Sequence, residues 1–404
     1  MALPTRERGE EGRALKAQVG NPQLLRTMNE RLLLDYLHEH GPSSRGDMAA
    51  ASGLSKPTVS AALAGLEAAG LAHVVESRGG KPGPSTAIYD MNPRAGLVAG
   101  VDIGRKWIRL AIADLRGEFV GRRDVRNTAR SGAELVRRVR ALAGEVAADA
   151  GIEWSVVSYV VIGSPGVLNR TTGRLELAPN LPGWGKAGLV EQLRAALQVE
   201  SVIENDINLA AVGEQTFGAG QGVRNFVLVS VGTGVGMGIV IGGALYVGGS
   251  GAAGEVSYLP NGDSEAPRSD ARQRGMTEAA ASAAGLMQAA RDAGLAFGSP
   301  EEIFAAAVAG DEQAQAVVEA EGRRIGALIT AVAAILDPEL VVLSGGVGRN
   351  LDVLGDAIAR RISELGPLRP RIVASDLGDG GVLLGAVARA LDVARDLLFE
   401  RSRS

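Results

Sequence analysis

The feature that most constrains this chain is a regular alternation of short apolar strands and helix-like segments that begins at Leu97. The stretches "LVAGVDIG", "WIRLAIADL" and "VVSYVVIG" are rich in β-branched and apolar residues, whereas "GAELVRRVRALAGEVAADAG" repeats its apolar residues with helical spacing. Such alternation is typical of α/β domains. With 404 residues the chain is too long for one ordinary domain, so we expect two or three.

Residues 23–90 have a different pattern, which predicts a helix-turn-helix with a wing. "LLRTMNERLLLDYLHEHG" has helical spacing and stops at Gly41-Pro42, and "SSRGDMAAASG" reads as a Ser-capped short helix ending at Gly53. "LSKPTVSAALAGLEAAG" follows, with Ser55 as N-cap and Pro57 in the first turn. Two helices joined by a tight Gly turn are typical of a helix-turn-helix. The next segment, "LAHVVESRGGKPGPSTAIYDM", alternates like two strands around a Gly/Pro tip.

This front unit is predicted to bind double-stranded DNA. Polar residues at the start of the second helix of the motif would enter the major groove, and basic residues on the flanks and wing would contact phosphates or the minor groove. The alternative is a three-helix module that binds protein. The candidate DNA-binding residues are Arg45, Ser55, Lys56, Thr58, Ser60, Arg78 and Lys81.

Composition excludes several classes of site. The chain has no cysteine, which removes disulfides, thiolate nucleophiles and Cys-ligated zinc. Its only histidines are His38, His40 and His73, so chemistry in the remaining three quarters of the chain has no imidazole base. The net charge of −4 argues against a protein that coats nucleic acid. The polar start and the lack of a long uncharged apolar run predict a cytoplasmic protein with no membrane partner.

Motifs in a fixed order carry a resemblance to a known family. They are "VDIG" (101–104), "PNLPGW" (179–184), "ENDINLAAVGE" (204–214), "GTGVGMGIVIGG" (232–243), "GAAGE" (251–255) and "LSGGVG" (343–348). In this order they resemble the ROK family of repressors, open reading frames and sugar kinases. The winged front end is similar to the family's repressor branch, that of xylose- and N-acetylglucosamine-type repressors.

The resemblance implies a fold and a division of the chain. The fold class is α/β, a two-lobed actin-like ATPase (ribonuclease H-like) domain preceded by the winged helix-turn-helix. We expect a disordered charged tail over residues 1–20 and the DNA-binding domain over 21–92. The first lobe would comprise residues 93–205, with the C-terminal helix of 380–404 packing back on it, and the second lobe would comprise 206–379.

The resemblance also implies which residues line the cleft between the lobes. Those that would bind a sugar are Ser164, Gly166, Asn180, Asn205, Asp206, Glu255, Tyr258 and Glu278. Asp206 occupies the position of the kinases' general base. Those of a vestigial nucleotide site are Asp102, Gly104, Gly232, Thr233, Gly234, Gly345 and Gly346. Carboxylates and amides suit the hydroxyls of a hexose, and the glycines have a simpler explanation as tight turns.

The sequence departs from the family's kinases at two places. The first hairpin has Arg105, Lys106 and Trp107 where the kinases carry a Gly-Gly-Thr type of loop. The family's zinc pattern, Cys-x-Cys-Gly-x-x-Gly-Cys-x-Glu, here reads "SDARQRGMTE" (269–278), and the histidine that ligates zinc in relatives falls at Tyr258. We therefore expect no zinc and no other cofactor.

These observations predict a sugar-responsive transcriptional regulator, a repressor of carbohydrate genes with no catalytic residues. Its partners would be a DNA operator, a sugar effector and further copies of itself in a dimer or tetramer. One alternative is an ATP-dependent sugar kinase with an added DNA-binding domain. Another is a regulator that has lost its ligand and is controlled by protein partners.

Overall fold

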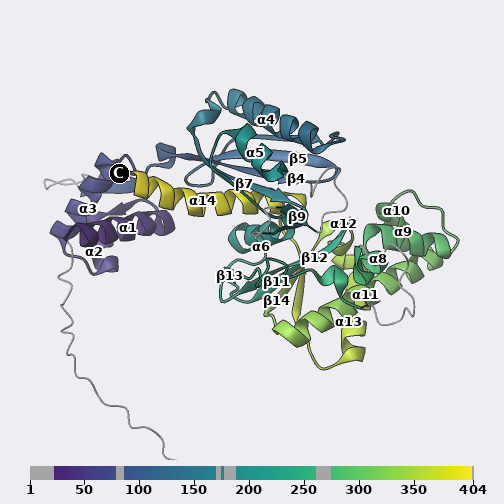
Figure 1. The fold of residues 1–404 in the computed structure, drawn as a ribbon. Helices are drawn as coiled ribbons and strands as arrows, with labels where there is room; N and C mark the ends of the chain where they lie inside the picture. Colours follow the sequence, from purple (N-terminus) through teal and green to yellow (C-terminus); the bar gives the residue numbers. More distant parts are fainter. Residues whose placement is uncertain (1–21, 79–85, 170–173, 177–187, 261–273, 403–404) are drawn as a thin grey trace, which may run out of the picture. The chain divides into compact units, whose positions relative to one another are not determined.

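The protein divides into two compact units, which are described separately here. A computed structural model describes residues 22–78, 86–169, 174–176, 188–260 and 274–402. The first unit comprises Met1–Ala95 with Arg401–Ser404, and the second comprises Gly96–Glu400 (Figure 1). Within these described ranges, no helix is both long and apolar enough to cross a membrane.

The first unit is a winged helix-turn-helix, as predicted. It contains α1 (Pro22–His40), α2 (Arg45–Ser52) and α3 (Lys56–Ala68), with β2 (Ala72–Arg78) and β3 (Thr86–Met91) forming the wing. Ser44 caps α2, Gly53 ends it in the left-handed conformation, and Ser55 caps α3. The short strand β1 (Ser43–Ser44), which the sequence did not reveal, adds to β3 in the order β1-β3-β2. Helices and wing enclose a buried core that includes Leu33, Leu37, Met48, Leu63 and Leu66.

The second unit begins with a five-stranded sheet in the order β10-β7-β4-β5-β6. Its strands are β4 (Leu97–Ile103), β5 (Trp107–Asp114), β6 (Phe119–Arg126), β7 (Val157–Ser164) and β10 (Ser201–Asn205). β4, β5 and β6 form an antiparallel meander, and β7 and β10 continue the sheet in parallel. Helices α4 (Gly132–Asp149) and α5 (Leu189–Leu197) cover one face, and α14 (Gly381–Arg401) covers the other (Figure 1). Between these elements lie η1 (Pro93–Ala95), η2 (Trp154–Val156) and the small pair β8 (Val167–Asn169) and β9 (Arg174–Glu176).

A second sheet follows in the order β13-β12-β11-β14-β15. Its strands are β11 (Phe226–Val231), β12 (Val235–Ile241), β13 (Ala244–Leu245), β14 (Leu340–Ser344) and β15 (Arg371–Ala374). One face packs on α6 (Asp206–Phe217). The other face and the helices beyond it form a large apolar core. Those helices and the remaining short turns are η3 (Val256–Tyr258), α8 (Met276–Ala281), α9 (Ala283–Asp292), α10 (Pro300–Val308), α11 (Glu312–Leu336), α12 (Gly345–Gly348), α13 (Leu351–Leu365) and η4 (Gly378–Gly380).

Helices α6 and α14 cross between the two sheets, and two glycines allow them to approach closely. A β-carbon on Gly385 of α14 would overlap the carbonyl oxygen of Leu209 in α6, and one on Gly213 of α6 would overlap the carbonyl oxygen of Gly381. On their outer sides α14 packs on Gly100 of β4 and α6 packs on Gly238 of β12. The crossing therefore joins the two sheets.

We predict that Gly385→Ala lowers the stability of the folded chain by about 1–3 kcal/mol, because the added methyl group forces two backbones apart. Gly144→Ala is the matched control, since Gly144 lies on α4 with open space around its α-carbon. That change should raise stability slightly through helix propensity, by at most about 1 kcal/mol. The midpoint of thermal unfolding measures both. A Gly385→Ala protein as stable as wild type would contradict the close crossing.

Candidate ligand-binding cleft

A cleft of about 390 Å³ opens where strands of both sheets end. In open α/β sheets ligands bind at this edge, outside the carboxyl ends of the strands. The cleft brings together most of the predicted sugar set, namely Gly166, Asn205, Asp206, Glu255, Tyr258 and Glu278. It also brings together the whole predicted nucleotide set, namely Asp102, Gly104, Gly232, Thr233, Gly234, Gly345 and Gly346. The order of the motifs along the chain thus predicted residues that lie around one cavity.

Two predicted sugar residues are not among those that line the cleft. Ser164 is fully buried, and its hydroxyl donates to the carbonyl oxygen of Pro165. Asn180, with its "PNLPGW" motif, lies outside the described residues, as do Lys81 of the wing and Ser269 and Ala271 of the zinc pattern.

At the sugar end of the cleft, Asn205 and Asp206 stand where β10 passes into α6. The Asn205 side chain caps α6, because its oxygen accepts from the backbone N–H groups of Ile207 and Asn208. Its amide nitrogen donates to the carbonyl oxygen of Gly166 at 3.1 Å. Oδ1 of Asp206 accepts a hydrogen bond from the backbone N–H of Ile207 at 2.9 Å. Asn205 therefore holds the site together, while Asp206 keeps capacity to accept bonds from a ligand.

Glu278 and Glu255 face this end from the second sheet and its helices. Glu278 is buried and has both oxygens engaged: Oε2 accepts the Val235 N–H at 3.2 Å, and Oε1 accepts from Nε of Arg274 at 3.0 Å. Burial and the nearby Glu278 raise the pKa of Glu255. At this end of the cleft Glu278 has a cation beside it, Arg274, which the sequence analysis missed. The only sign of this contact in the sequence is the spacing of four residues.

Charge in this end of the cleft is crowded and negative. Burial, and then the carboxylate of Asp102, raise the pKa of Asp206 to about 7, against the hydrogen bond from Ile207 that lowers it. A carboxyl group near its pKa at neutral pH both accepts and donates hydrogen bonds. Asp206 is accordingly suited to the hydroxyl groups of an uncharged polyol.

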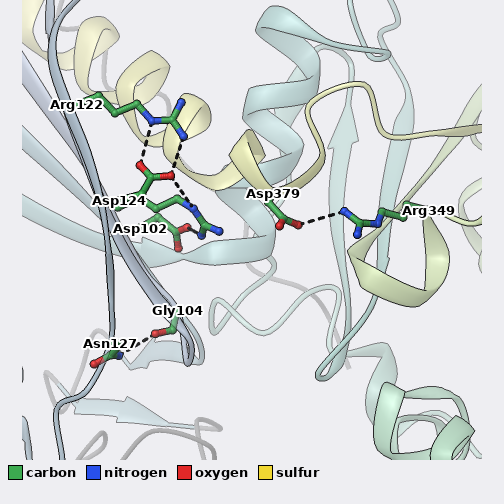
Figure 2. Close-up of polar contacts among 8 residues, drawn as sticks. Asp102, Gly104, Arg122, Asp124, Asn127, Arg349 and Asp379 are labelled. Carbon is green, nitrogen blue, oxygen red and sulfur yellow. Dashed lines mark hydrogen bonds and ion pairs between the residues drawn. The ribbon is translucent and has the colours of Figure 1, made fainter. Parts of the chain in front are cut away.

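At the other end, the β4–β5 hairpin projects Arg105 and Lys106 into the cleft mouth. A tight turn closes the hairpin, with the Gly104 N–H donating to the Trp107 carbonyl oxygen at 2.9 Å. The Asn127 side chain braces the turn by donating to the Gly104 carbonyl oxygen at 2.8 Å (Figure 2). The Arg126 guanidinium lies 4.3 Å from the centre of the Trp107 ring. The loop with Arg105, Lys106 and Trp107 is thus a braced hairpin.

A chain of ion pairs connects strands β4, β5 and β6 next to this hairpin (Figure 2). Nη1 of Arg109 lies 2.7 Å from Oδ2 of Asp102, and Nε of Arg109 lies 3.5 Å from Oδ2 of Asp124. Arg122 closes the chain, with its Nη2 3.0 Å from Asp124. Burial raises the pKa of Asp102 to about 6 even though Arg109 opposes that rise. Sequence reasoning missed Arg109, although it pairs directly with Asp102 across the hairpin.

In the winged unit four of the predicted DNA-binding residues, Ser55, Lys56, Thr58 and Ser60, lie at the start of α3. Ser55 and Lys56 are exposed, and the Thr58 hydroxyl lies 2.8 Å from that of Ser55. Arg45, at the start of α2, donates to the Tyr89 hydroxyl and lies over its ring. The helix start therefore presents Lys56 with no ion-pair partner among the described residues, while Arg45 is held against the wing.

The winged unit and the two-sheet cleft each match a known class of domain. The model of the ROK family matches residues 98–393, and the model of the MarR family matches residues 26–81. The ROK match covers most of the chain, so this protein belongs to the ROK family.

Two relatives that align with nearly the whole chain are regulators. The chain is 24% identical over 399 residues to the xylose repressor of Bacillus subtilis, covering 94% of this chain and 99% of that protein. The crystal structure of a ROK family transcriptional regulator, described as a homologue of the Escherichia coli MLC protein, has the same fold. It aligns with a TM-score of 0.77 at 22% identity, over 94% of this chain and 98% of that one.

Glucokinases match the second unit. The glucokinase of Thermotoga maritima is 31% identical over 302 residues, which are 70% of this chain and 88% of the enzyme. The structure of a ROK family glucokinase from Streptomyces griseus with glucose and AMPPNP has a TM-score of 0.62 at 27% identity. It covers 74% of this chain and 100% of the enzyme. The expected family and fold class are confirmed.

Proposed function

We propose that the protein is a DNA-binding transcriptional repressor whose operator binding responds to a sugar held in the cleft. The observation that carries the proposal is the pairing, in one chain, of a winged helix-turn-helix with a cleft whose Asp206 and Glu255 suit sugar hydroxyls. The full-length similarity to the Bacillus xylose repressor supports it. The regulated genes would then be those of carbohydrate metabolism.

A sugar in this cleft would contact both sheets. Asn205 and Asp206 stand at the end of β10 in the first sheet, whereas Glu255 and Glu278 belong to segments packed on the second. A ligand that binds one arrangement of the two sheets more tightly shifts the population toward that arrangement. If DNA affinity differs between the arrangements, sugar and operator are coupled by the same free energy in both directions. We propose that the operator is double-stranded DNA bound by a homo-oligomer, because dimers of such modules read paired half-sites.

The second candidate function is ATP-dependent sugar phosphorylation. It is favoured by Asp206, whose pKa of about 7 suits a general base, and by the glucokinase relatives. Against it stand the braced Arg105-Lys106 hairpin and the pairing of Asp102 with Arg109. We propose that the wild-type protein transfers no phosphoryl group. Control by protein partners alone is disfavoured because Tyr258 is 43% exposed and does not fill the cleft.

We also propose that the protein holds no zinc. Tyr258 and Met276, which stand at two of the family's ligand positions, supply a phenol and a thioether in place of imidazole and thiolate. Metal analysis of the purified protein after dialysis against a chelator should find far less than one zinc per chain. Retention of about one equivalent would contradict this.

DNA recognition should depend on the start of α3. We predict that Lys56→Ala and Thr58→Ala each weaken binding to the specific operator by about 1–3 kcal/mol, if each residue contacts a base edge. Arg78→Ala should weaken binding on all sequences alike, as loss of a phosphate contact does. Arg31→Ala is the control, since it removes a cation of α1 that is paired with Asp35. Arg31→Ala should bind like wild type, and gel shifts in which the Lys56, Thr58 and Arg78 variants also bind like wild type would remove the winged unit from the proposal.

Asp206→Asn separates the sensor from the enzyme. In a sensor the carboxylate accepts a hydroxyl hydrogen bond, so its replacement should weaken sugar binding by about 1–3 kcal/mol and raise the sugar concentration needed for operator release. Operator affinity without sugar should stay unchanged. In a kinase the carboxylate acts mainly in the transition state, so turnover would collapse with sugar affinity retained. Calorimetry of sugar binding and operator gel shifts measure the difference.

Asp356→Asn is the matched control for this change, because Asp356 is exposed on α13 and does not line the cleft. It should leave both sugar binding and operator release as in wild type. Robust ATP-dependent phosphorylation of a sugar by the wild-type protein, abolished in Asp206→Asn, would overturn the sensor and establish the kinase.

A further inference from the structure

The phosphate end of the cleft contains a buried carboxylate that needs a positive partner. Asp102 is 5% exposed and lies at the carboxyl end of β4, beside the cleft glycines. A buried ionised carboxylate is stable only when it is paired or coordinates a metal. In proteins that transfer phosphoryl groups, an aspartate holds the magnesium ion that bridges the nucleotide's phosphates. What neutralises Asp102 therefore decides what this end of the cleft can bind.

The partner of Asp102 is built into the chain. Asp102 and Arg109 are directly opposite one another across the β4–β5 hairpin, and their side chains meet at 2.7 Å. The Arg109 side chain is only 14% exposed. Its Nε faces Asp124 at 3.5 Å, so one guanidinium lies between two carboxylates (Figure 2). Arg122 supplies Asp124 with a second, more exposed cation, which leaves the four groups with no net charge.

A magnesium ion does not fit this arrangement. It requires close to octahedral coordination by oxygen atoms at about 2.0–2.1 Å, and Oδ2 of Asp102 is already committed to a guanidinium nitrogen. An ion beside that oxygen would also stand next to a fixed positive charge.

We propose that Arg109 takes the place of a divalent cation beside Asp102 and is the residue that makes this cleft refuse magnesium nucleotides. This role of Arg109 goes beyond the proposed sugar response, because it determines which ligands the cleft excludes. The cleft binds its ligand without a metal, and its affinity does not depend on divalent ions. Removing the guanidinium leaves Asp102 and Asp124 facing the vacated space, and two carboxylates around one space attract a divalent cation.

The test is a titration of the purified full-length chain with Mn²⁺, followed by electron paramagnetic resonance, and a calorimetric titration with magnesium and AMPPNP. Wild type should show no Mn²⁺ binding that depends on Asp102, and no binding of the magnesium nucleotide. Arg109→Ala should gain one saturable Mn²⁺ site, at least about tenfold tighter than any background site. Adding Asp102→Asn to that variant should abolish the gain.

Two further variants control for charge and for folding. Arg109→Lys keeps a cation beside Asp102 and should still exclude Mn²⁺. Arg122→Ala removes the neighbouring exposed guanidinium but leaves Arg109 in place, so it should gain no site. Circular dichroism and operator binding establish that each variant is folded. If Arg109→Ala does not fold, Arg109→Met keeps the apolar stem without the charge and should gain the same site.

Either of two results would overturn the proposal. One is binding of magnesium AMPPNP to wild type that is lost in Asp102→Asn. The other is a folded Arg109→Ala or Arg109→Met protein that gains no Mn²⁺ site. Neither result bears on sugar-dependent operator release, which is measured on the wild-type protein without metal, so failure here is distinct from failure of the proposed function.

Discussion

The architecture of the second unit depends on the close crossing of α6 and α14. These two helices pack against opposite sheets. Gly213 and Gly385 let their backbones come so close that a β-carbon at either position would overlap the backbone of the other helix. Because the crossing fixes one sheet against the other, the carboxyl ends of their strands border one cavity. Asp206 is the first residue of α6, so the same helix that joins the sheets carries the central carboxylate of the cleft.

The carboxylates of the cleft lie at two ends, and those at one end have a cation beside them whereas two of those at the other end do not. At the phosphate end Asp102 is paired with Arg109, and at the sugar end Asp206 and Glu255 are left with raised pKa values. A partly buried carboxylate with no cation beside it is unfavourable for folding, and groups with perturbed pKa values concentrate at functional sites. Among the residues that would meet a sugar, Glu278 is the one with a cation beside it in the described part of the chain, and that cation is Arg274.

Most of the elements could be predicted from the sequence, because the caps at Ser44 and Ser55, the glycine turns and the strand patterns are encoded locally. The residues of the cleft were predicted from the resemblance of the motifs to the ROK family, since local patterns do not show which strand ends meet. Side-chain partners were harder to predict, since Asn205 and Glu278 look like ligand groups but are largely used within the protein. Arg109 was within reach. The tight turn from Gly104 to Trp107 sets a register that places residue 109 opposite residue 102.

The difference between a kinase and a sensor built on this fold reduces to where positive charge is supplied. A kinase needs mobile positive charge that arrives with its nucleotide and follows the phosphoryl group through the transition state. A sensor needs only a ligand affinity that differs between two states of the protein. The Arg109 guanidinium, fixed between Asp102 and Asp124, pairs with both carboxylates in the absence of any nucleotide. Because it is fixed in place, it cannot move with a phosphoryl group. Asp206, with its pKa near neutrality, is left free to respond to a sugar hydroxyl. In the sensor that we propose, the carboxylate that would serve as a base in a kinase is a hydrogen-bonding group for the sugar.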